Sequence, residues 1–162
     1  MTKTSLPTSP KPLTRIDKNI LTQLQANGRI SYVDLAAEVG LSTSACIERV
    51  RRLERGGYIK GYTALLNPVL LDAPILVYVE VTLEKIAADA FTEFGRAVLD
   101  LPQILECHMV SGNFDYLLKI RIRNMPSYRD LLGRILQELP GIRDTNSYVV
   151  MDELKETCQL QL

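Results

Sequence analysis

The sequence predicts an α+β fold in which an N-terminal winged helix-turn-helix is followed by a βαββαβ, ferredoxin-like sandwich. Two capped amphipathic segments meet at a glycine within residues 31–55, and an alternating stretch that contains a glycine follows over residues 58–66. Residues 75–151 then alternate between β-branched apolar runs and segments of helical periodicity. We therefore expect a mobile tail over residues 1–13, a DNA-binding domain over 14–66, a hinge over 67–74 and a second domain over 75–162.

The first helix is predicted to begin near Thr14 or Asp17 and to end at Asn27 and Gly28. Between these limits, apolar residues recur at near-helical spacing: Ile16, Ile20, Leu21 and Leu24.

The second and third helices are predicted from their caps. Ser31 and Ser42 are each able to accept a backbone N–H in the first turn that follows, and Gly40 between them suits a positive φ. The apolar residues expected to face inward are Val33, Leu35, Ala36 and Val39 in the second helix and Cys46, Val50 and Leu53 in the third.

The third helix has the composition of a helix that enters the major groove of DNA. Small side chains at its start allow close approach to base edges, and arginines further along are placed to reach phosphates. A basic helix by itself is more often a solvated surface, but a preceding capped helix and a glycine turn favour DNA recognition. The wing is predicted over residues 58–66, with Lys60 near its tip. The predicted DNA-binding residues are Ser42, Thr43, Ser44, Ala45, Glu48, Arg49, Arg51, Arg52, Arg55 and Lys60.

Charge is distributed unevenly along a chain whose formal net charge is zero. Residues 1–60 hold ten Lys and Arg against five Asp and Glu, a net of +5, whereas residues 61–162 hold nine against fourteen, a net of −5. A basic first part attracts a polyanion and an acidic second part is repelled by it, so the two parts are expected to have different roles.

The second domain is predicted as strands over residues 75–83, 104–110, 116–122 and 142–151, with helices over 87–101 and 126–139. Apolar residues fall on both faces of the first strand, with Ile75, Val77, Val79 and Val81 alternating with Leu76, Tyr78 and Leu83. Two helices cover one face only, so we expect a second copy of the chain to pack sheet to sheet against the other.

The sequence gives little support to other classes of protein. Its three cysteines are widely spaced and it has one histidine, which favours reduced thiols and no metal site. No acid, base and nucleophile converge in the pattern, so no enzyme activity is expected. No apolar run is long enough to span a bilayer and the start lacks the apolar centre of a signal peptide, which predicts a cytoplasmic protein without a membrane partner. With the predicted DNA binding, we expect it to be nucleoid-associated.

Four separate blocks of the chain resemble one known family. Residues 49–55 (RVRRLER), 61–68 (GYTALLNP), 106–119 (ECHMVSGNFDYLLK) and 148–151 (YVVM) are similar to the leucine-responsive regulatory protein (Lrp/AsnC, or feast/famine) family of transcription regulators, over about residues 14–157. The resemblance implies regulation of amino-acid metabolism, a RAM-type second domain, homodimers joined through the sheets and their assembly into octamers around which promoter DNA can wrap.

In the family the effector is an amino acid held where dimers meet, near the turn between the second and third strands of the second domain. An α-amino acid needs an anion for its ammonium, N–H or hydroxyl donors for its carboxylate, and an apolar wall. Asp115 suits the ammonium, and the effector is expected to be leucine or methionine, with no other cofactor. This chain has Asn113 where a second acid is frequent in the family, which leaves the preferred amino acid open. The predicted effector-binding residues are Val77, Met109, Ser111, Gly112, Asn113, Phe114, Asp115, Met125, Thr145 and Ser147.

Two other interpretations stay open from the sequence. The chain has the pattern of a ligand-sensing regulatory subunit of a metabolic enzyme as well, with its helical part docking to protein. It also suits a sequence-tolerant nucleoid protein that packs DNA, which the ratio of specific to non-specific affinity would distinguish.

Overall fold

The computed structural model describes residues 12–84 and 89–162. They form two compact units, one from the start of the described chain to Leu65 together with Lys155–Leu162, and one over Leu66–Leu154. Each unit has its own hydrophobic core. The mobile tail predicted over residues 1–13 falls outside the described residues except for its last two.

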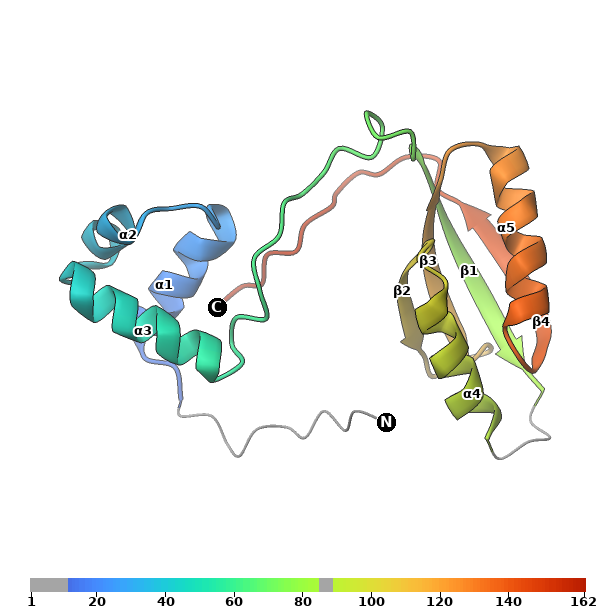
Figure 1. Ribbon diagram of the computed structural model, residues 1–162, viewed down its shortest axis with the longest axis horizontal. Coiled ribbons are helices and arrows are strands. Elements are labelled where there is room, and N and C mark those ends of the chain that lie inside the picture. Colours follow the sequence, from blue (N-terminus) through green and yellow to red (C-terminus); the bar gives the residue numbers. More distant parts are fainter. Residues whose placement is uncertain (1–11, 85–88) are drawn as a thin grey trace. The chain divides into compact units, whose positions relative to one another are not determined.

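The first unit contains three helices, α1 (Arg15–Ala26), α2 (Tyr32–Val39) and α3 (Thr43–Arg55), shown in Figure 1. Ser31 and Ser42 cap α2 and α3 by accepting the backbone N–H of Asp34 and Ala45. Gly40 ends α2 in the left-handed conformation, at φ 68°. The capped helix pair and its glycine turn are therefore confirmed.

The core of the first unit contains the apolar residues expected from the helical spacing, with one exception. Its buried members are Ile20, Leu21, Leu35, Ala36, Cys46, Val50 and Leu53. Val33 was expected to face inward, but its side chain is 65% exposed. It lies in the first turn of α2, where its side chain stays in solvent while Leu35 and Ala36 are buried.

The predicted β-hairpin wing is absent. Residues 56–74, all of which the structure describes, contain no strand. The N–H groups of Tyr58 and Ile59 donate back to the carbonyl of Leu53, and the hydroxyl of Tyr62 donates to Glu54. The alternation of the segment resembles a strand, but a strand requires a paired neighbour, and residues 12–65 and 155–162 of this unit contain no strand.

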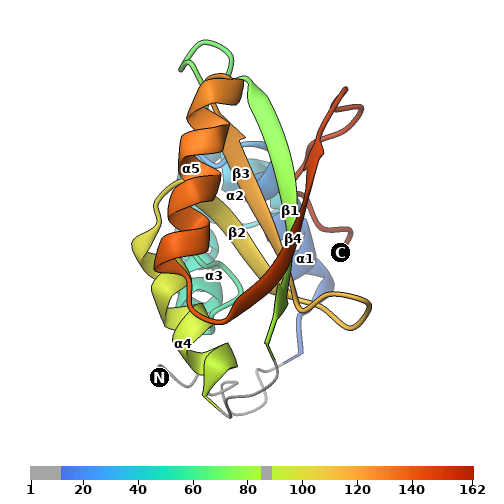
Figure 2. The same ribbon diagram turned by 90° about the vertical axis from the view of Figure 1, so that its right-hand side faces the viewer.

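The second unit has the predicted βαββαβ order: β1 (Ile75–Leu83), α4 (Ala90–Ala97) with the short 3₁₀ turn η1 (Val98–Asp100), β2 (Ile104–Met109), β3 (Tyr116–Ile122), α5 (Met125–Glu138) and β4 (Ile142–Val149). The sheet order is β2-β3-β1-β4 and every neighbouring pair is antiparallel. Figures 1 and 2 show α4 and α5 on one face of this sheet. The fold class is confirmed, although the first residues of the helix predicted from 87 lie outside the described part.

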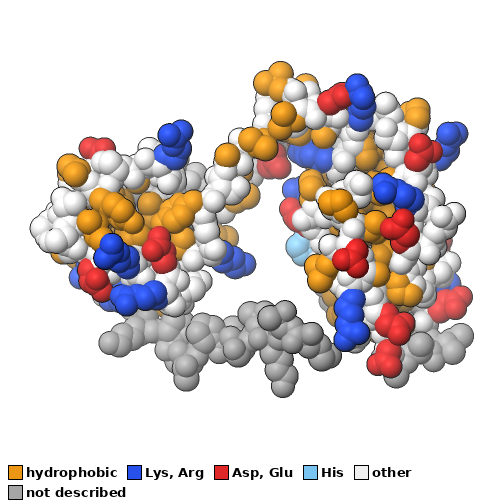
Figure 3. Space-filling view, in the orientation of Figure 1, with side chains coloured by type: hydrophobic (Ala, Val, Ile, Leu, Met, Phe, Trp, Pro, Cys, Tyr) orange, Lys and Arg blue, Asp and Glu red, His pale blue; other side chains and the backbone are white. Residues whose placement is uncertain are grey.

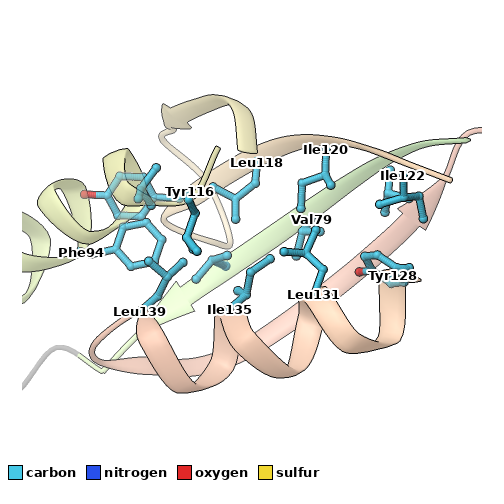
Figure 4. Packing of buried hydrophobic residues seen from close by; sticks show 14 of the residues in the cluster. Val79, Phe94, Tyr116, Leu118, Ile120, Ile122, Tyr128, Leu131, Ile135 and Leu139 are labelled. Carbon is cyan, nitrogen blue, oxygen red and sulfur yellow. The ribbon is translucent and has the colours of Figure 1, made fainter. Parts of the chain in front are cut away.

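The core of the second unit lies between the sheet and its two helices. Phe94 of α4 stacks on Tyr116 of β3 with ring centroids 4.5 Å apart, and Leu131 and Ile135 of α5 pack nearby (Figure 4). Val77, Val79, Val81 and Leu83 of β1 are fully buried in it. Leu83 was expected on the opposite face with Leu76 and Tyr78, and that expectation is wrong.

The face of the sheet without helices is more polar than expected. Glu106 forms ion pairs with Lys119 and His108 at 3.0 Å each, and Tyr148 donates a hydrogen bond to Glu80. Arg121 pairs with Glu153 at 2.7 Å. The largest exposed aliphatic groups lie elsewhere, so sheet-to-sheet packing of two copies stays a prediction.

Candidate functional site

The first half of the candidate site is the outer surface of α3. Three buried residues fix which side of α3 faces inward: Cys46, Val50 and Leu53. The start of α3 presents Thr43 and Ser44, both exposed, and Ala45, which is partly buried. These short side chains leave the beginning of the helix unobstructed, as close approach to base edges requires.

A buried carboxylate holds two arginines of α3. Asp17 of α1 is 0% exposed, and its Oδ1 lies 3.0 Å from Arg49 Nη1 and 2.6 Å from Arg52 Nη2. Its Oδ2 accepts from the backbone N and the hydroxyl of Thr14, at 2.9 and 2.7 Å. The same residue therefore closes the capping box of α1 and ties α1 to α3. We call Asp17, Arg49 and Arg52 the Asp17 clasp.

Electrostatics keep this carboxylate ionised. Burial alone raises the pKa of Asp17, but hydrogen bonds from Thr14 and Arg49 and the positive charge of Arg52 outweigh burial and lower it to about 2. Arg49 and Arg52 keep 31% and 46% of their side-chain surface exposed. The clasp therefore leaves part of each arginine side chain exposed to solvent.

The remaining predicted DNA-binding residues are more loosely held. Arg51, Arg55 and Glu48 are exposed, and Arg55 pairs with Glu48 at 3.0 Å. Such an exposed pair contributes little to stability. Lys60 is also exposed, but it lies on the segment that has no strand, so its predicted position at a wing tip is wrong.

The second half of the candidate site is the loop over residues 110–115, between β2 and β3. The loop is closed by the N–H of Val110, which donates to the carbonyl of Asp115 at 3.0 Å. Ser111, Gly112 and Asn113 are exposed, and Phe114 and Asp115 are partly buried. A Cβ on Gly112 would meet no atom within 4 Å, so the loop is open around it.

The Asp115 carboxylate has a structural partner. Its Oδ2 accepts the backbone N–H of Leu83 at 2.8 Å, and its own N–H donates to the carbonyl of Val81 at 2.9 Å. Asp115 thus fastens the loop to the end of β1.

Sheet register brings several of the predicted effector residues together. Met109 pairs with Tyr116, Tyr116 with Val81 and Val81 with Thr145, so all four form one row across the sheet beside the loop. Ser147 lies one row further on the same face, opposite Val79, and its hydroxyl hydrogen-bonds that of Tyr128. The loop, Met109 and Thr145 therefore lie at one end of the sheet.

Two predicted effector residues do not join this group. Val77 is 0% exposed within the core, so in this structure it does not line a surface open to an effector. Met125 begins α5, which follows the other end of β3. The alternation of side chains along β1 places Val77 on the face that the helices cover. It is also four residues of extended chain, about 13 Å, from Val81 and the loop end of the sheet.

Sequence reasoning missed the role of Asp17. The signal was present, because Asp17 stands on the same helical stripe as Ile20, Leu21 and Leu24. An acidic residue on an inward stripe requires a cationic or hydrogen-bonding partner. Its partners lie 32 and 35 residues further along the chain, so the sequence does not identify them.

Among residues 12–84 and 89–162 no group of three His, Cys, Asp or Glu side chains is placed to hold a metal ion. Within the same residues no helix combines the length and the apolar composition needed to cross a membrane.

Comparison with known proteins bears on both halves of the site. Residues 13–60 match the family model described as winged helix-turn-helix DNA-binding, and residues 76–160 match the Lrp/AsnC ligand binding domain. The leucine-responsive regulatory proteins of Salmonella typhimurium and Escherichia coli are each 59% identical over 150 residues, covering 93% of this chain and 92% of theirs.

Solved structures agree with this result. A transcriptional regulator from Neisseria meningitidis in complex with L-methionine has a TM-score of 0.88 and 33% identity, covering 93% of this chain and 97% of its own. A feast or famine regulatory protein from M. tuberculosis complexed with L-methionine has a TM-score of 0.82 and 30% identity, covering 92% and 99%.

Proposed function

Because the chain belongs to the Lrp/AsnC family of DNA-binding transcription regulators with an amino-acid effector, we propose that it recognises specific promoter sequences through the outer surface of α3. The observation that carries the proposal is the exposed start of α3, with Thr43 and Ser44 in front of an arginine-bearing flank. Its target genes are those of amino-acid metabolism, and it works at the nucleoid, where those promoters lie. Its part is binding and regulation rather than catalysis.

In this proposal each group on α3 has a separate task. Thr43, Ser44 and Ala45 approach base edges, and the exposed parts of Arg49, Arg51, Arg52 and Arg55 approach phosphates. The clasp supports this division, because it fixes the direction of two guanidinium groups before DNA arrives. Less side-chain freedom is then lost on binding.

For the effector we propose methionine or leucine, bound at the loop end of the second unit. Two similar structures are complexes with L-methionine, and curated relatives at 59% identity are leucine-responsive by name. Asp115 supplies the anion for the ammonium group, Thr145 a hydroxyl, and Met109, 63% exposed, an apolar contact. A thermal-shift screen of the twenty amino acids tests this, since a ligand that binds only the folded state raises the melting temperature.

Removing the charge of Asp115 is expected to abolish the response to the effector. Asp115→Asn keeps an oxygen to accept the Leu83 N–H but loses the charge that pairs with the ammonium, so affinity for methionine should fall by roughly tenfold or more. Asp115→Ala should in addition lose about 1–2 kcal/mol of stability, because the Leu83 N–H loses its acceptor. Calorimetric titration with methionine and leucine, beside thermal unfolding, measures both effects.

Asp115→Asn with unchanged titrations would show that another group holds the ammonium. Equal stability of the Asn and Ala variants would show that the hydrogen bond to Leu83 contributes little.

We also propose that the chain forms homodimers, which assemble further to octamers. The connecting segment supports self-association: Leu65, Leu66, Val69, Leu70 and Leu71 are between 59% and 82% exposed. Figure 3 shows hydrophobic side chains over the turn before β1, at the top of the view. The carboxamide oxygen of Asn67 accepts the N–H groups of Val69 and Leu70, so this turn is ordered although its leucines face solvent. A second copy of the segment is the covering we propose.

Placing a charge in this segment is expected to weaken self-association. Leu70→Asp should raise the dimer dissociation constant by roughly tenfold or more, because burial of one leucine contributes about 1.5–3 kcal/mol. Leu99→Asp is the matched control, since Leu99 is 83% exposed in η1, outside the segment. Light scattering across a dilution series gives the masses, and identical curves for the two variants would exclude the segment from the interface.

A further inference from the structure

The last residues of the chain contact the end of α1. The Nε2 of Gln25 donates to the carbonyl of Leu160 at 3.1 Å, and the N–H of Leu160 donates to Gln25 Oε1 at 2.6 Å. The side-chain amide of Gln159 donates to the backbone carbonyl of Gln25 at 3.3 Å. Three hydrogen bonds thus join positions that are 134 and 135 residues apart.

The C-terminal end of α1 has backbone groups that can accept hydrogen bonds from this segment. The last four carbonyls of a helix have no partner within the helix, and the last turn of α1 carries no basic side chain that could satisfy them. Gln159 donates to one of these carbonyls. Within the segment itself, the N–H of Gln159 donates to the Thr157 hydroxyl at 3.1 Å.

The chain connects this contact to both halves of the candidate site. The segment continues from β4, the strand that carries Thr145 and Ser147. It ends on α1, the helix whose Asp17 holds Arg49 and Arg52 of α3. One continuous stretch of chain therefore leads from a predicted effector strand to hydrogen bonds with α1, the helix whose Asp17 holds the recognition helix.

We propose that residues 157–162 are an internal strap that docks on the C-terminal end of α1 through Gln25 and tethers the DNA-binding unit at a second point. The first point is the connecting segment that precedes β1. The inference rests on the proposed function, because it assumes that α3 binds DNA and that two copies act together.

The docking is weak enough to be reversible. Its hydrogen bonds are exposed and Leu160 is 73% exposed, so little apolar surface is buried. Contacts of this kind open at a small cost in free energy, which allows an event at β4 to change the docked fraction. A unit held at two points samples fewer orientations than one held at a single point. The strap therefore raises the effective concentration of the second recognition helix once the first has bound.

The test compares DNA with one and with two half-sites. Selection from a random duplex library gives both fragments, and binding is measured for the full chain, for Gln25→Ala and for a chain ending at Glu156. Both changes should lower the affinity for the two-site fragment by roughly three- to tenfold. The affinity of each variant for the one-site fragment should stay within about twofold of that of the full chain. Gln23→Ala is the matched control, because Gln23 lies on the same helix and is also partly buried.

Hydrogen exchange supplies a readout that does not depend on DNA. Gln25→Ala should speed exchange of the Leu160 amide, whose acceptor it removes, and Gln23→Ala should not. If the full chain binds neither fragment, the proposed function has failed. The exchange experiment still shows whether residues 157–162 dock on α1.

Two results would overturn the strap. One is a Leu160 amide that exchanges equally fast in the full chain and in Gln25→Ala. The other is a combination of two observations. The truncated chain has a different assembly mass from the full chain in light scattering, while Gln25→Ala binds both DNA fragments with the affinity of the full chain. The tail would then act between copies of the chain and not on α1.

Discussion

Asp17→Asn is expected to lower the free energy of unfolding of the helical unit by about 2–3 kcal/mol, since it leaves two partly buried arginines without their anion. The loss lies below that of a fully buried pair because both arginines reach water. The neutral side chain also weakens the capping box with Thr14. Urea unfolding followed by helical circular dichroism measures the change.

Asp34 provides a matched control for this substitution. It occupies the same position after the cap of α2 that Asp17 occupies after the cap of α1, and it accepts from the Ser31 hydroxyl at 2.6 Å. It is exposed, however. Asp34→Asn should therefore cost only about 0.5–1 kcal/mol. Equal losses for the two variants would mean that the Asp17 clasp adds nothing beyond capping.

The same clasp predicts a pH dependence. The folded pKa of Asp17 is about 2 and its ordinary value is 3.8, so the unfolded chain binds the proton more tightly. This contribution to stability is complete above the ordinary value and is lost as the pH falls toward 2. It amounts to about 2 kcal/mol and should be missing from the acid unfolding curve of Asp17→Asn.

Local features of the fold were predictable because their causes are local. Ser31, Gly40 and Ser42 place the ends of α2 and α3 through hydrogen bonds and a backbone angle that involve nearby residues only. The strand over 75–83 has the predicted limits, since its β-branched run is bounded by Pro74 and by the charged Glu84.

Features that depend on distant partners were not predictable in the same way. The segment over 58–66 alternates like a strand but has no strand beside it. Lys60 was predicted at the tip of a wing that this segment does not form. Asp17 needs Arg49 and Arg52, which only the packing of α1 on α3 brings near. Val77 looked suitable for an apolar wall, but sheet register and helix cover place it inside the core.

Ser44→Glu is expected to reduce DNA affinity by roughly a hundredfold, because it places an anion where the proposed interface meets the phosphates and base edges. Its effect on stability should be small or slightly favourable. The first turn of α3 has no acidic residue, and a negative charge there interacts well with the helix dipole. Loss of binding without loss of folding would therefore identify a contact surface.

Ser127→Glu is the matched control for charge. Ser127 is exposed in the first turn of α5, which also lacks an acidic residue, and it belongs to the second unit. Ser127→Glu changes the net charge by the same amount as Ser44→Glu. If repulsion acts only near the interface, the DNA affinity of Ser127→Glu should stay within about twofold of that of the unmodified chain.

The most direct test of recognition through α3 is fluorescence anisotropy of a labelled promoter fragment, titrated with the unmodified chain, Ser44→Glu and Ser127→Glu at several salt concentrations. We predict tight binding with a steep fall in log affinity against log salt for the unmodified chain and for Ser127→Glu, and only weak binding for Ser44→Glu. Ser44→Glu binding with the same affinity and the same salt slope as the unmodified chain would contradict recognition through α3.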